Sequence, residues 1–557
     1  MPAAQPGGAV PAPLRNPARH HSVRARRHQM NAPADSLVGT GSLVRLILRR
    51  DRWLLALGIL LLAGYPILGV ENASAGFVEL AESPGMLMLH GPLYGTTRGA
   101  LATWSSVDFL WAYGLVSLLM VIRHTRADEE AGRRELLGAT VAGRHSGLAA
   151  ALAVTLAGNL VLALVTAAGE IAQGLPVTGA IAFGLMLAAV GWTFAALGAL
   201  VAQLTQTAAA ARGIGVAVLG MTFLLRAAGD VGGAGGSRSW LSWLSPLGLA
   251  NEIRPFAGER WWILALFAVM VAALTSAAVV LSARRDVGAG LVRPGLGPAR
   301  ATPWLRGPVA LAWRLQRGPM LGWVVGLVVL AGVFAGTAES AGEFFDDSEQ
   351  LKDMFERIGG RAGASDVFLA AIFGILGLIA AGYAVQAALW LRTEEEQLRA
   401  EPVLATATAR LRWVASHLAF SLLGPAVALA AAGLVAGLVY GVSVGDLGRQ
   451  VPRMLGAATV QLIGVWVLTG IVVALFGLLP RLAPAAWVAW VAFLILMMIG
   501  AVFQVSQTLL DLSPFTHLPK LPGGHLDRTT LAWLLGIAAG LTLAGLTGVR
   551  HRDIGRT

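Results

Sequence analysis

Two segments of this 557-residue chain carry acidic and basic side chains at a spacing that suits charge-based chemistry. Residues 126–144 read RADEEAGRRELLGATVAGR, and residues 392–410 read RTEEEQLRAEPVLATATAR; 8 of 19 positions are identical at an offset of 266. A Glu that precedes an Arg by four positions forms a favourable ion pair along a helix. The spacing therefore predicts a short amphipathic helix in each segment, with its charges paired to one another.

The charged residues of these segments are the ones that could act on a ligand or contact a partner. The expected helical pairs are Glu129 with Arg133, Glu130 with Arg134, and Glu395 with Arg399. One such segment is most simply a solvated helix, but two at matched positions favour a docking surface for a partner protein. The candidate docking residues are Asp128, Glu129, Glu130, Arg133, Glu135, Arg144, Glu394, Glu395, Glu396, Arg399, Glu401 and Arg410.

The sequence excludes several other kinds of site. The only lysines, Lys352 and Lys520, follow Leu351 and Pro519, so neither stands in the Gly-Lys-Ser/Thr ending of a nucleotide-binding P-loop. There are no cysteines, and the 10 histidines form no HxxxH pair or His/carboxylate cluster with metal-ligand spacing. We therefore predict no catalytic, cofactor-binding or metal-binding residue, and we do not expect an enzyme.

Long apolar runs separate the charged segments. Hydrophobic residues make up 56% of the chain and charged residues 13%, whereas soluble domains carry about 25% charged residues. Helices of about 20 apolar residues cross a hydrocarbon layer of about 30 Å. The chain is therefore predicted to be an all-α polytopic membrane protein with about twelve spans. The predicted spans are 53–70, 103–122, 147–169, 179–203, 209–228, 261–283, 320–337, 367–390, 414–440, 454–478, 483–506 and 529–549.

The distribution of basic residues predicts the orientation of these spans. With the amino terminus in the cytoplasm, the cytoplasmic segments hold 30 Lys and Arg residues and the outer segments hold 12, as the positive-inside rule requires. The net charge of +11 then follows from topology and not from nucleic-acid binding. We predict a multi-pass protein of the cell membrane with both termini in the cytoplasm and a disordered cytoplasmic tail over residues 1–35.

Two more motif pairs repeat at nearly the same offset as the charged segments. Leu-Ser-Pro occurs at 244–246 and 512–514, and Arg-Asp-Val-Gly at 285–288 matches Arg-Asp-Ile-Gly at 552–555. Three motifs in the same order at offsets of 266–268 indicate an internal repeat. Six spans return the chain to its starting side, so the two halves insert in parallel. The predicted parts are a first six-helix half at 36–283, a linker at 284–305 and a second six-helix half at 306–557.

Three further features bear on mechanism. Residues 41–52 predict a short interfacial helix with leucines opposite arginines, although simple basic flanking of a span explains them equally well. Residues 239–262, aromatic and interrupted by two prolines, predict a re-entrant or interfacial element. Asp108 and Glu170 are ionisable residues near the outer ends of predicted spans, where they are either functional candidates or interfacial residues.

Several of these segments together resemble one family. DEEAGRRELLGATVAGR at 128–144, WLSPLG at 243–248, RPFAGERWW at 254–262, ARRDVGAGLV at 283–292 and LSPFTHLPKLPGG at 512–524 are similar to segments of ABC-type exporter permeases of the polyketide-antibiotic (tetronasin-resistance) group. The resemblance runs from about residue 40 to the end of the chain.

The resemblance implies a permease subunit that moves hydrophobic or amphipathic small molecules, such as antibiotics and drugs, out of the cell. It implies a separate ABC-type ATPase subunit in two copies, which would hold ATP and Mg, while this chain holds no cofactor. Residues 128–144 and 394–410 would be coupling helices resting on the ATPases, and Pro402 would shorten or bend the second one.

Two other functions remain open from the residues alone. An ion-coupled secondary transporter acting without an ATPase would need carboxylates or broken helices near the membrane midplane, where the predicted spans place almost no acid. A membrane enzyme acting on lipid-linked substrates would need clustered acid–base groups, whereas the acids on the cytoplasmic side are matched by arginines.

Overall fold

A computed structural model describes residues 35–72, 84–138, 142–232, 240–286, 288–292, 305–347, 363–499 and 507–552, together with the single residues 78, 81 and 300. The described residues form helices and contain no strand. Eleven of these helices are long and apolar enough to cross a membrane. The prediction of an all-α polytopic membrane protein is confirmed.

The chain divides into two compact units. Unit 1 comprises residues 1–73, 97–223 and 246–294, and unit 2 comprises residues 74–96, 224–245 and 295–557. The main division falls inside the segment expected to be the linker. Two short segments from the first half of the sequence belong to unit 2, which the sequence did not indicate.

The helices before residue 300 provide the whole of unit 1 and two segments of unit 2. In chain order they are η1 (Asp35–Leu37), α2 (Thr40–Asn72), α4 (Pro84–His90), α5 (Arg98–Ser106), η2 (Val107–Phe109), α6 (Leu110–Ile122), η3 (Arg123–Ala127), α7 (Asp128–Glu130), α8 (Arg133–Gly138), α9 (Ser146–Ala172), α10 (Val177–Leu204), α11 (Ala208–Gly232), α12 (Trp240–Leu244), α13 (Pro246–Asn251) and α14 (Trp262–Arg284).

The helices after residue 300 all belong to unit 2. In chain order they are α15 (Pro308–Asp347), α17 (Ala364–Glu396), α18 (Ala400–Leu404), α19 (Arg410–Ser443), α20 (Leu447–Val460), α21 (Leu462–Leu478), η4 (Pro480–Leu482), α22 (Ala485–Ile499), α23 (Gln507–Leu510) and α24 (Arg528–His551).

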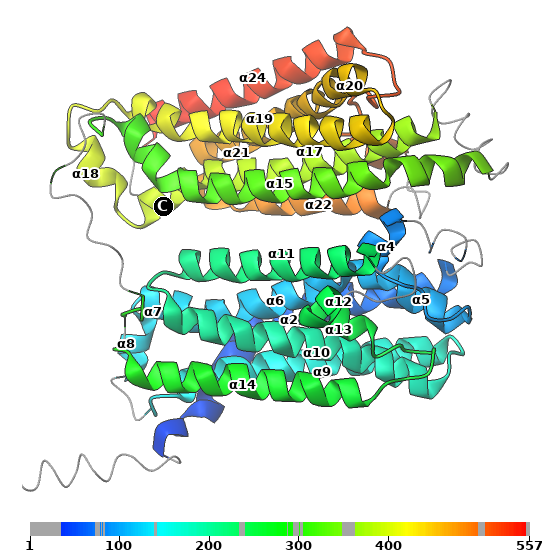
Figure 1. Ribbon diagram of the computed structural model, residues 1–557. Helices are drawn as coiled ribbons and strands as arrows, with labels where there is room; N and C mark the ends of the chain where they lie inside the picture. The colour runs from blue at the N-terminus through cyan, green and yellow to red at the C-terminus, as the bar shows by residue number, and fades with distance from the viewer. Residues whose placement is uncertain are drawn as a thin grey trace, which may run out of the picture. The chain divides into compact units, whose positions relative to one another are not determined.

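Helix α10 forms the centre of unit 1. It packs against α6, α9 and α14, which run beside it in Figure 1, and 78% of its most apolar stretch is buried. Two glycines permit this close packing. A Cβ atom on Gly184 would lie 2.4 Å from the carbonyl oxygen of Ala163 on α9, and one on Gly198 would lie 2.9 Å from that of Leu118 on α6. Small residues at such crossings let helix backbones approach one another in membranes.

The helix contacts inside unit 2 correspond to those inside unit 1 when the spans are counted in order. Helix α19 packs against α15 and α20, and α21 packs against α17 and α24. The counterparts in unit 1 are the contacts of α9 with α2 and α10, and of α10 with α6 and α14. The fourth span is also the most buried in each unit, with 67% of the most apolar stretch of α20–α21 buried. The packing therefore agrees with the internal repeat seen in the sequence.

Several spans differ from their predicted extents. The predicted span 483–506 is found as α22, whose apolar part Ala485–Leu494 is shorter than the eleven long spans, and residues 500–506 lie outside the described residues. The predicted span 320–337 lies inside α15, which already begins at Pro308. Residues 1–34 of the predicted tail also lie outside the described residues.

A break in α2 creates a separate helix at its amino-terminal end. Asp51 has φ −110° and ψ 15°, which are not helical values. Before the break, Ile47 is buried against Ala150 and Val154 of α9, whereas Arg45 and Arg49 are exposed. A short helix is thus present where residues 41–52 predict one, and its place at the membrane interface stays a prediction.

Helix α13 is a buried element in the segment predicted to be re-entrant or interfacial. It packs against α10 and α14, and Leu247 and Ala250 are fully buried. The chain then turns through positive φ angles at Arg254 and Phe256. The Phe256 ring lies so close to α10 that a Cβ atom on Gly179 would stand 2.1 Å from its Cδ1 atom. This segment therefore contributes side chains to the core of unit 1.

Candidate functional site

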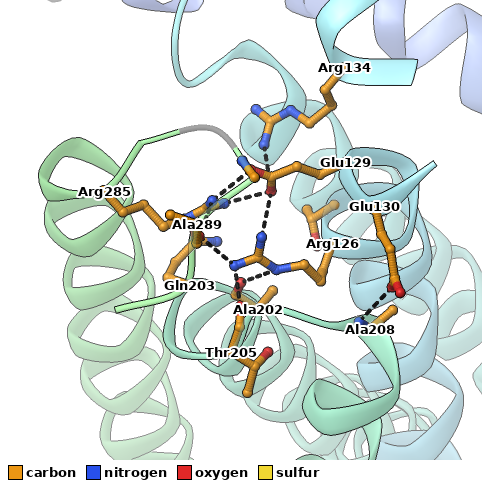
Figure 2. Close-up of polar contacts among 12 residues, drawn as sticks. Arg126, Glu129, Glu130, Arg134, Ala202, Gln203, Thr205, Ala208, Arg285 and Ala289 are labelled. Carbon is orange, nitrogen blue, oxygen red and sulfur yellow. Dashed lines mark hydrogen bonds and ion pairs between the residues drawn. The ribbon is translucent and has the colours of Figure 1, made fainter. Parts of the chain in front are cut away.

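A buried ion pair ties the charged segment after α6 to the end of α14. The π-helical turn η3 connects α6 to the single turn α7, and the side chain of Glu129 in α7 is 1% exposed. Arg285 donates from Nη1 and Nη2 to the two carboxylate oxygens of Glu129, at 2.6 and 2.8 Å (Figure 2). A two-point contact of this kind is among the strongest between arginine and carboxylate.

Neighbouring groups complete this ion pair. Arg285 also donates from Nε to Gln203 Oε1 at 2.8 Å, and the Gly288 N–H donates to Glu129 Oε1 at 2.7 Å. Arg126, with its side chain 1% exposed, places Nη1 3.3 Å from Glu129 Oε2. We call the Glu129–Arg285 ion pair the first clasp. It holds α7, the end of α10 and the segment after α14 together, as Figure 2 shows.

The matching residues in unit 2 form a second clasp, the Glu395–Arg552 ion pair. Glu395 lies in the last turn of α17, and Arg552 directly follows α24. Arg552 Nη2 lies 2.7 and 2.8 Å from the two carboxylate oxygens of Glu395. The guanidinium carbon stands 4.5 Å from the ring centre of Phe476 on α21, in the range of a cation–π contact. The second clasp thus uses one guanidinium nitrogen where the first uses two.

A second contact also repeats around the clasps. Arg144 Nη2 donates to the carbonyl oxygen of Arg285 at 3.1 Å, and Arg410 Nη1 donates to the carbonyl oxygen of Arg552 at 3.1 Å. Arg144 and Arg410 end the two repeated segments at the offset of 266. Each repeated segment is therefore fastened to the end of the sixth span of its unit at two points.

A third repeated contact joins the second span to the fourth. Arg126 Nη2 donates to the carbonyl oxygen of Thr205, just after α10, and Arg392 Nη1 donates to that of Pro480, just after α21. The last carbonyl groups of a helix have no donor within the helix itself. The two arginines supply such donors at the ends of the two most buried spans.

The two repeated segments also turn at the same position. Gly132 has φ +71° and Leu398 has φ +57°. The N–H of Gly132 donates to the carbonyl oxygen of Glu129, and that of Leu398 to the carbonyl oxygen of Glu395, both at 3.0 Å. Positive φ suits glycine and strains a branched residue such as leucine. The turn follows each helix, which ends one residue after its clasp residue.

The predicted helical ion pairs of the first segment are wrong. Arg133 Nη2 lies 2.6 Å from Asp128 and not beside Glu129. Arg134 Nη1 lies 3.8 Å from Glu129, while the Glu130 carboxylate accepts the first backbone N–H of α11 at 2.9 Å. The reason is the turn after α7, which interrupts the helical spacing on which the predicted pairs depend.

The second segment departs from the prediction in the same way. Arg399 Nε lies 3.4 Å from Glu394 and not beside Glu395. Arg392, which was not among the candidate residues, pairs with Glu396 at 2.6 Å. Glu395 is turned inward to a partner on a different helix, so local spacing does not determine its contact.

The clasps divide the candidate docking residues by exposure. Glu129, Glu394 and Glu395 are buried, and Asp128 is half-buried with Arg50 Nη1 at 3.1 Å. These acids are already engaged inside their own unit. The exposed candidates are Glu130, Arg133, Glu135, Arg144, Glu396, Arg399, Glu401 and Arg410.

The amphipathic helices predicted for these segments are short. Helix α8 has 6 residues and α18 has 5 residues. Val403 and Leu404 of α18 pack on a cluster that contains Trp413. Pro402 lies inside α18, whose short length agrees with its predicted effect.

The first segment carries an additional buried cluster at the break in α2. His124 Nε2 lies 2.7 Å from Asp51 Oδ2, and its Nδ1 lies 3.9 Å from Asp128 Oδ2. Arg123 Nη2 donates to Asp51 Oδ1 at 2.8 Å. At the matched position Trp390 donates from Nε1 to Glu394 at 3.1 Å. The matched position thus holds an aromatic ring nitrogen beside a carboxylate in both units.

The pKa values of Arg134 and His145, which lie outside the spans, reflect burial and the charges around the first clasp. Burial lowers the pKa of the Arg134 guanidinium, and the Glu129 carboxylate opposes that effect. Burial also lowers the pKa of His145, with Arg144 and Arg134 adding to the effect. Arginine remains charged at neutral pH, so Arg134 and Arg144 supply positive charge near the first clasp.

The clasps hold charged groups inside each unit. Glu129 accepts from guanidinium groups and from a backbone N–H, whereas Glu395 accepts from one guanidinium nitrogen. Within the described ranges no three His, Cys, Asp or Glu residues are grouped in a way that could hold a metal ion. Exposed charged residues lie on either side of α8 and α18, next to the buried pairs.

Sequence reasoning missed Arg285 and Arg552 as site residues. The signal was present, because Arg-Asp-Val-Gly and Arg-Asp-Ile-Gly repeat at the same offset as the acidic segments. The repeated Arg-Asp motif indicated only the internal repeat, and the sequence alone did not pair its arginine with an acid. The structure shows that this arginine contacts a glutamate of the repeated acidic segment in each unit.

The fold and these charged ends define a multi-pass α-helical membrane protein made of two matched sets of helices. The chain is 42% identical over 545 residues to the multidrug efflux system permease protein Rv1217c of Mycobacterium tuberculosis (strain ATCC 25618 / H37Rv), which covers 95% of this chain and 98% of that protein. Residues 305–550 match the family described as "Multidrug efflux system permease Rv1217c, C-terminal domain". This chain belongs to the Rv1217c family of multidrug efflux permeases.

Proposed function

We propose that this chain is the transmembrane permease subunit of an ATP-binding-cassette exporter. It moves hydrophobic or amphipathic small molecules, including antibiotics and drugs, out of the cell. The observation that carries the proposal is the match over nearly the full length to a protein named as a multidrug efflux system permease. The finer resemblance to the polyketide-antibiotic (tetronasin-resistance) group supports a polyketide or similar amphipathic cargo.

The energy source in this proposal is a separate ABC-type ATPase in two copies, which holds the ATP and Mg. Support comes from the sequence, since neither lysine stands in a P-loop, and from the two repeated charged segments. The exposed residues next to α8 and α18 form one contact surface in each unit. The buried clasps transmit a push on these surfaces to the second, fourth and sixth spans. Both termini then lie on the same cytoplasmic side as the ATPases.

Copurification with a candidate ATPase tests this division of labour. Charge reversal at the exposed Glu135 and Glu401 (E135R and E401R) should reduce ATPase binding and drug-stimulated ATP hydrolysis together, because the contact is lost while the clasps stay intact. The exposed Glu71 at the far end of α2 provides a matched control, and E71R should leave both unchanged. Full drug transport by the purified chain alone, without any ATPase, would instead favour an ion-coupled secondary transporter.

A further inference from the structure

Three polar side chains in the last turns of α9 and at its C-cap have buried oxygen atoms without a hydrogen-bond partner in the described part of the chain. They are Thr166 Oγ1, Glu170 Oε2 and Gln173 Oε1. Thr166 is 0% exposed and Glu170 is 1% exposed. Spacings of four and three residues place the three side chains on one face of the helix, one turn apart. This face lies at the end of α9 remote from the first clasp.

The neighbouring helices leave the carboxyl group without a counter-charge. Gln173 donates from Nε2 to the carbonyl oxygen of Ile67 on α2 at 2.8 Å, which turns its Oε1 atom away from α2. Tyr113 on α6 is the titratable group within electrostatic range of Glu170, with Asp108 also near that tyrosine. The Tyr113 hydroxyl already donates to a carbonyl oxygen of α2 at 2.8 Å. Among the described residues no arginine, lysine or histidine pairs with Glu170.

The matching helix of unit 2 packs without polar side chains at the positions that correspond to Thr166, Glu170 and Gln173. The internal repeat, at its offset of 266, places Ala432, Ala436 and Val439 of α19 at the matching positions. Ala432 and Ala436 are buried as well, so the equivalent helix of unit 2 packs with apolar residues there. The polar face of α9 is therefore an addition confined to unit 1.

Burying a carboxylate without a compensating charge or donor is costly, and ionisable groups inside membrane spans commonly mark ion or proton sites. A proton on Glu170 would let its O–H group donate to one of the two neighbouring unpartnered oxygens. A sodium ion would be held by carboxylate, hydroxyl and amide oxygens, the hard donors that such ions prefer. Either occupant neutralises Glu170 and uses oxygens that are otherwise unpartnered.

We propose that the Thr166–Glu170–Gln173 face of α9 is a binding site for a small cation, either H⁺ or Na⁺. Glu170 supplies the negative charge, and Thr166 and Gln173 supply neutral oxygen ligands or acceptors. The site is independent of ATPase docking. It gives this permease a cation-dependent element that the repeat does not carry in unit 2.

The test uses the full chain in lipid nanodiscs without any ATPase. The sodium arm compares the thermal unfolding midpoint in NaCl with that in choline chloride at equal ionic strength. The proton arm follows the infrared C=O band of a protonated carboxylic acid as pH is raised. The variants are E170Q, which keeps the shape of the side chain, and T166V, which removes one oxygen. E71Q removes an exposed acid at the end of α2 and is the matched control.

A sodium site predicts a midpoint that rises in Na⁺ for the wild type and for E71Q, with the rise lost in E170Q and reduced in T166V. A proton site predicts no sodium effect, together with a protonated-acid band at neutral pH that is absent only in E170Q. An ionised Glu170 at neutral pH combined with no sodium effect would overturn the proposal. If E170Q does not fold, T166V decides the sodium arm, and the wild-type band decides the proton arm.

Discussion

Removing either partner of the first clasp should strongly destabilise unit 1. In E129L the buried Arg285 loses two charged contacts of 2.6 and 2.8 Å, and Arg126 loses its neighbouring carboxylate at 3.3 Å. Breaking a buried ion pair by removing one partner costs about 3–5 kcal/mol, because the other charge stays buried and uncompensated. We expect E129L and R285M each to lower the free energy of unfolding by about that amount.

The double variant E129L/R285M, compared with the two single variants, measures the interaction energy between Glu129 and Arg285. When both charges are replaced by apolar residues, much of the loss should return, so the double variant should cost less than either single variant and the two single losses should not add. Part of the loss should persist, because the Gly288 N–H and Arg126 still face the position of the lost carboxylate, and each unsatisfied buried group costs about 1–3 kcal/mol. The assay is reversible unfolding in mixed micelles as the denaturing detergent fraction is raised, followed by circular dichroism.

Two comparisons make this prediction specific. R133M removes an arginine that is 50% exposed in its pair with Asp128, and it should cost less than about 1 kcal/mol, as exposed ion pairs do. E395L in the second clasp removes contacts to one guanidinium nitrogen, and it should cost about 1.5–3 kcal/mol. If E129L proves as mild as R133M, or if the two losses in unit 1 simply add, the pair is not the energetic link described above.

Two further predictions concern backbone and packing. Leu398→Gly should raise the unfolding midpoint and Gly132→Leu should lower it, each by the equivalent of about 1 kcal/mol, because both positions have positive φ; equal effects in the same direction would contradict this account. Gly179→Ala should lower the free energy of unfolding by about 1–3 kcal/mol, because the new methyl group overpacks against Phe256. In a Phe256→Ala background the same substitution should cause no loss. Thermal melts of the wild type, the two single variants and the double variant measure both effects.

The spans could be predicted from the sequence because their cause is local. A helix that crosses a bilayer must present about 20 apolar residues in a row, and that requirement is visible in any window of the chain. The exception was the span 483–506, where the apolar composition continues but the apolar helix is short. A short interfacial helix was one of two interpretations of residues 41–52, and the break at Asp51 was not predicted.

The contacts of the charged segments could not be predicted in the same way. A helical spacing of four suggested that Glu129 pairs with Arg133, but this requires the helix to continue, and the turn at Gly132 ends it. The real partner, Arg285, lies 156 positions further along the chain, and only the packing of α14 against α10 brings it there. Long-range contacts of this kind follow from the fold, and the sequence records them only through the repetition of both motifs.

Each clasp is self-sufficient within one copy of the internal repeat. Glu129 and Arg285 come from the first copy, and Glu395 and Arg552 come from the second. An ancestral gene half as long would already have encoded both partners, so its duplication and fusion would create two clasps without the invention of any new contact. Once doubled, one copy could diverge while the other kept the original geometry. The extra donors around Glu129 and the aromatic ring beside Arg552 are differences of the kind that such divergence leaves.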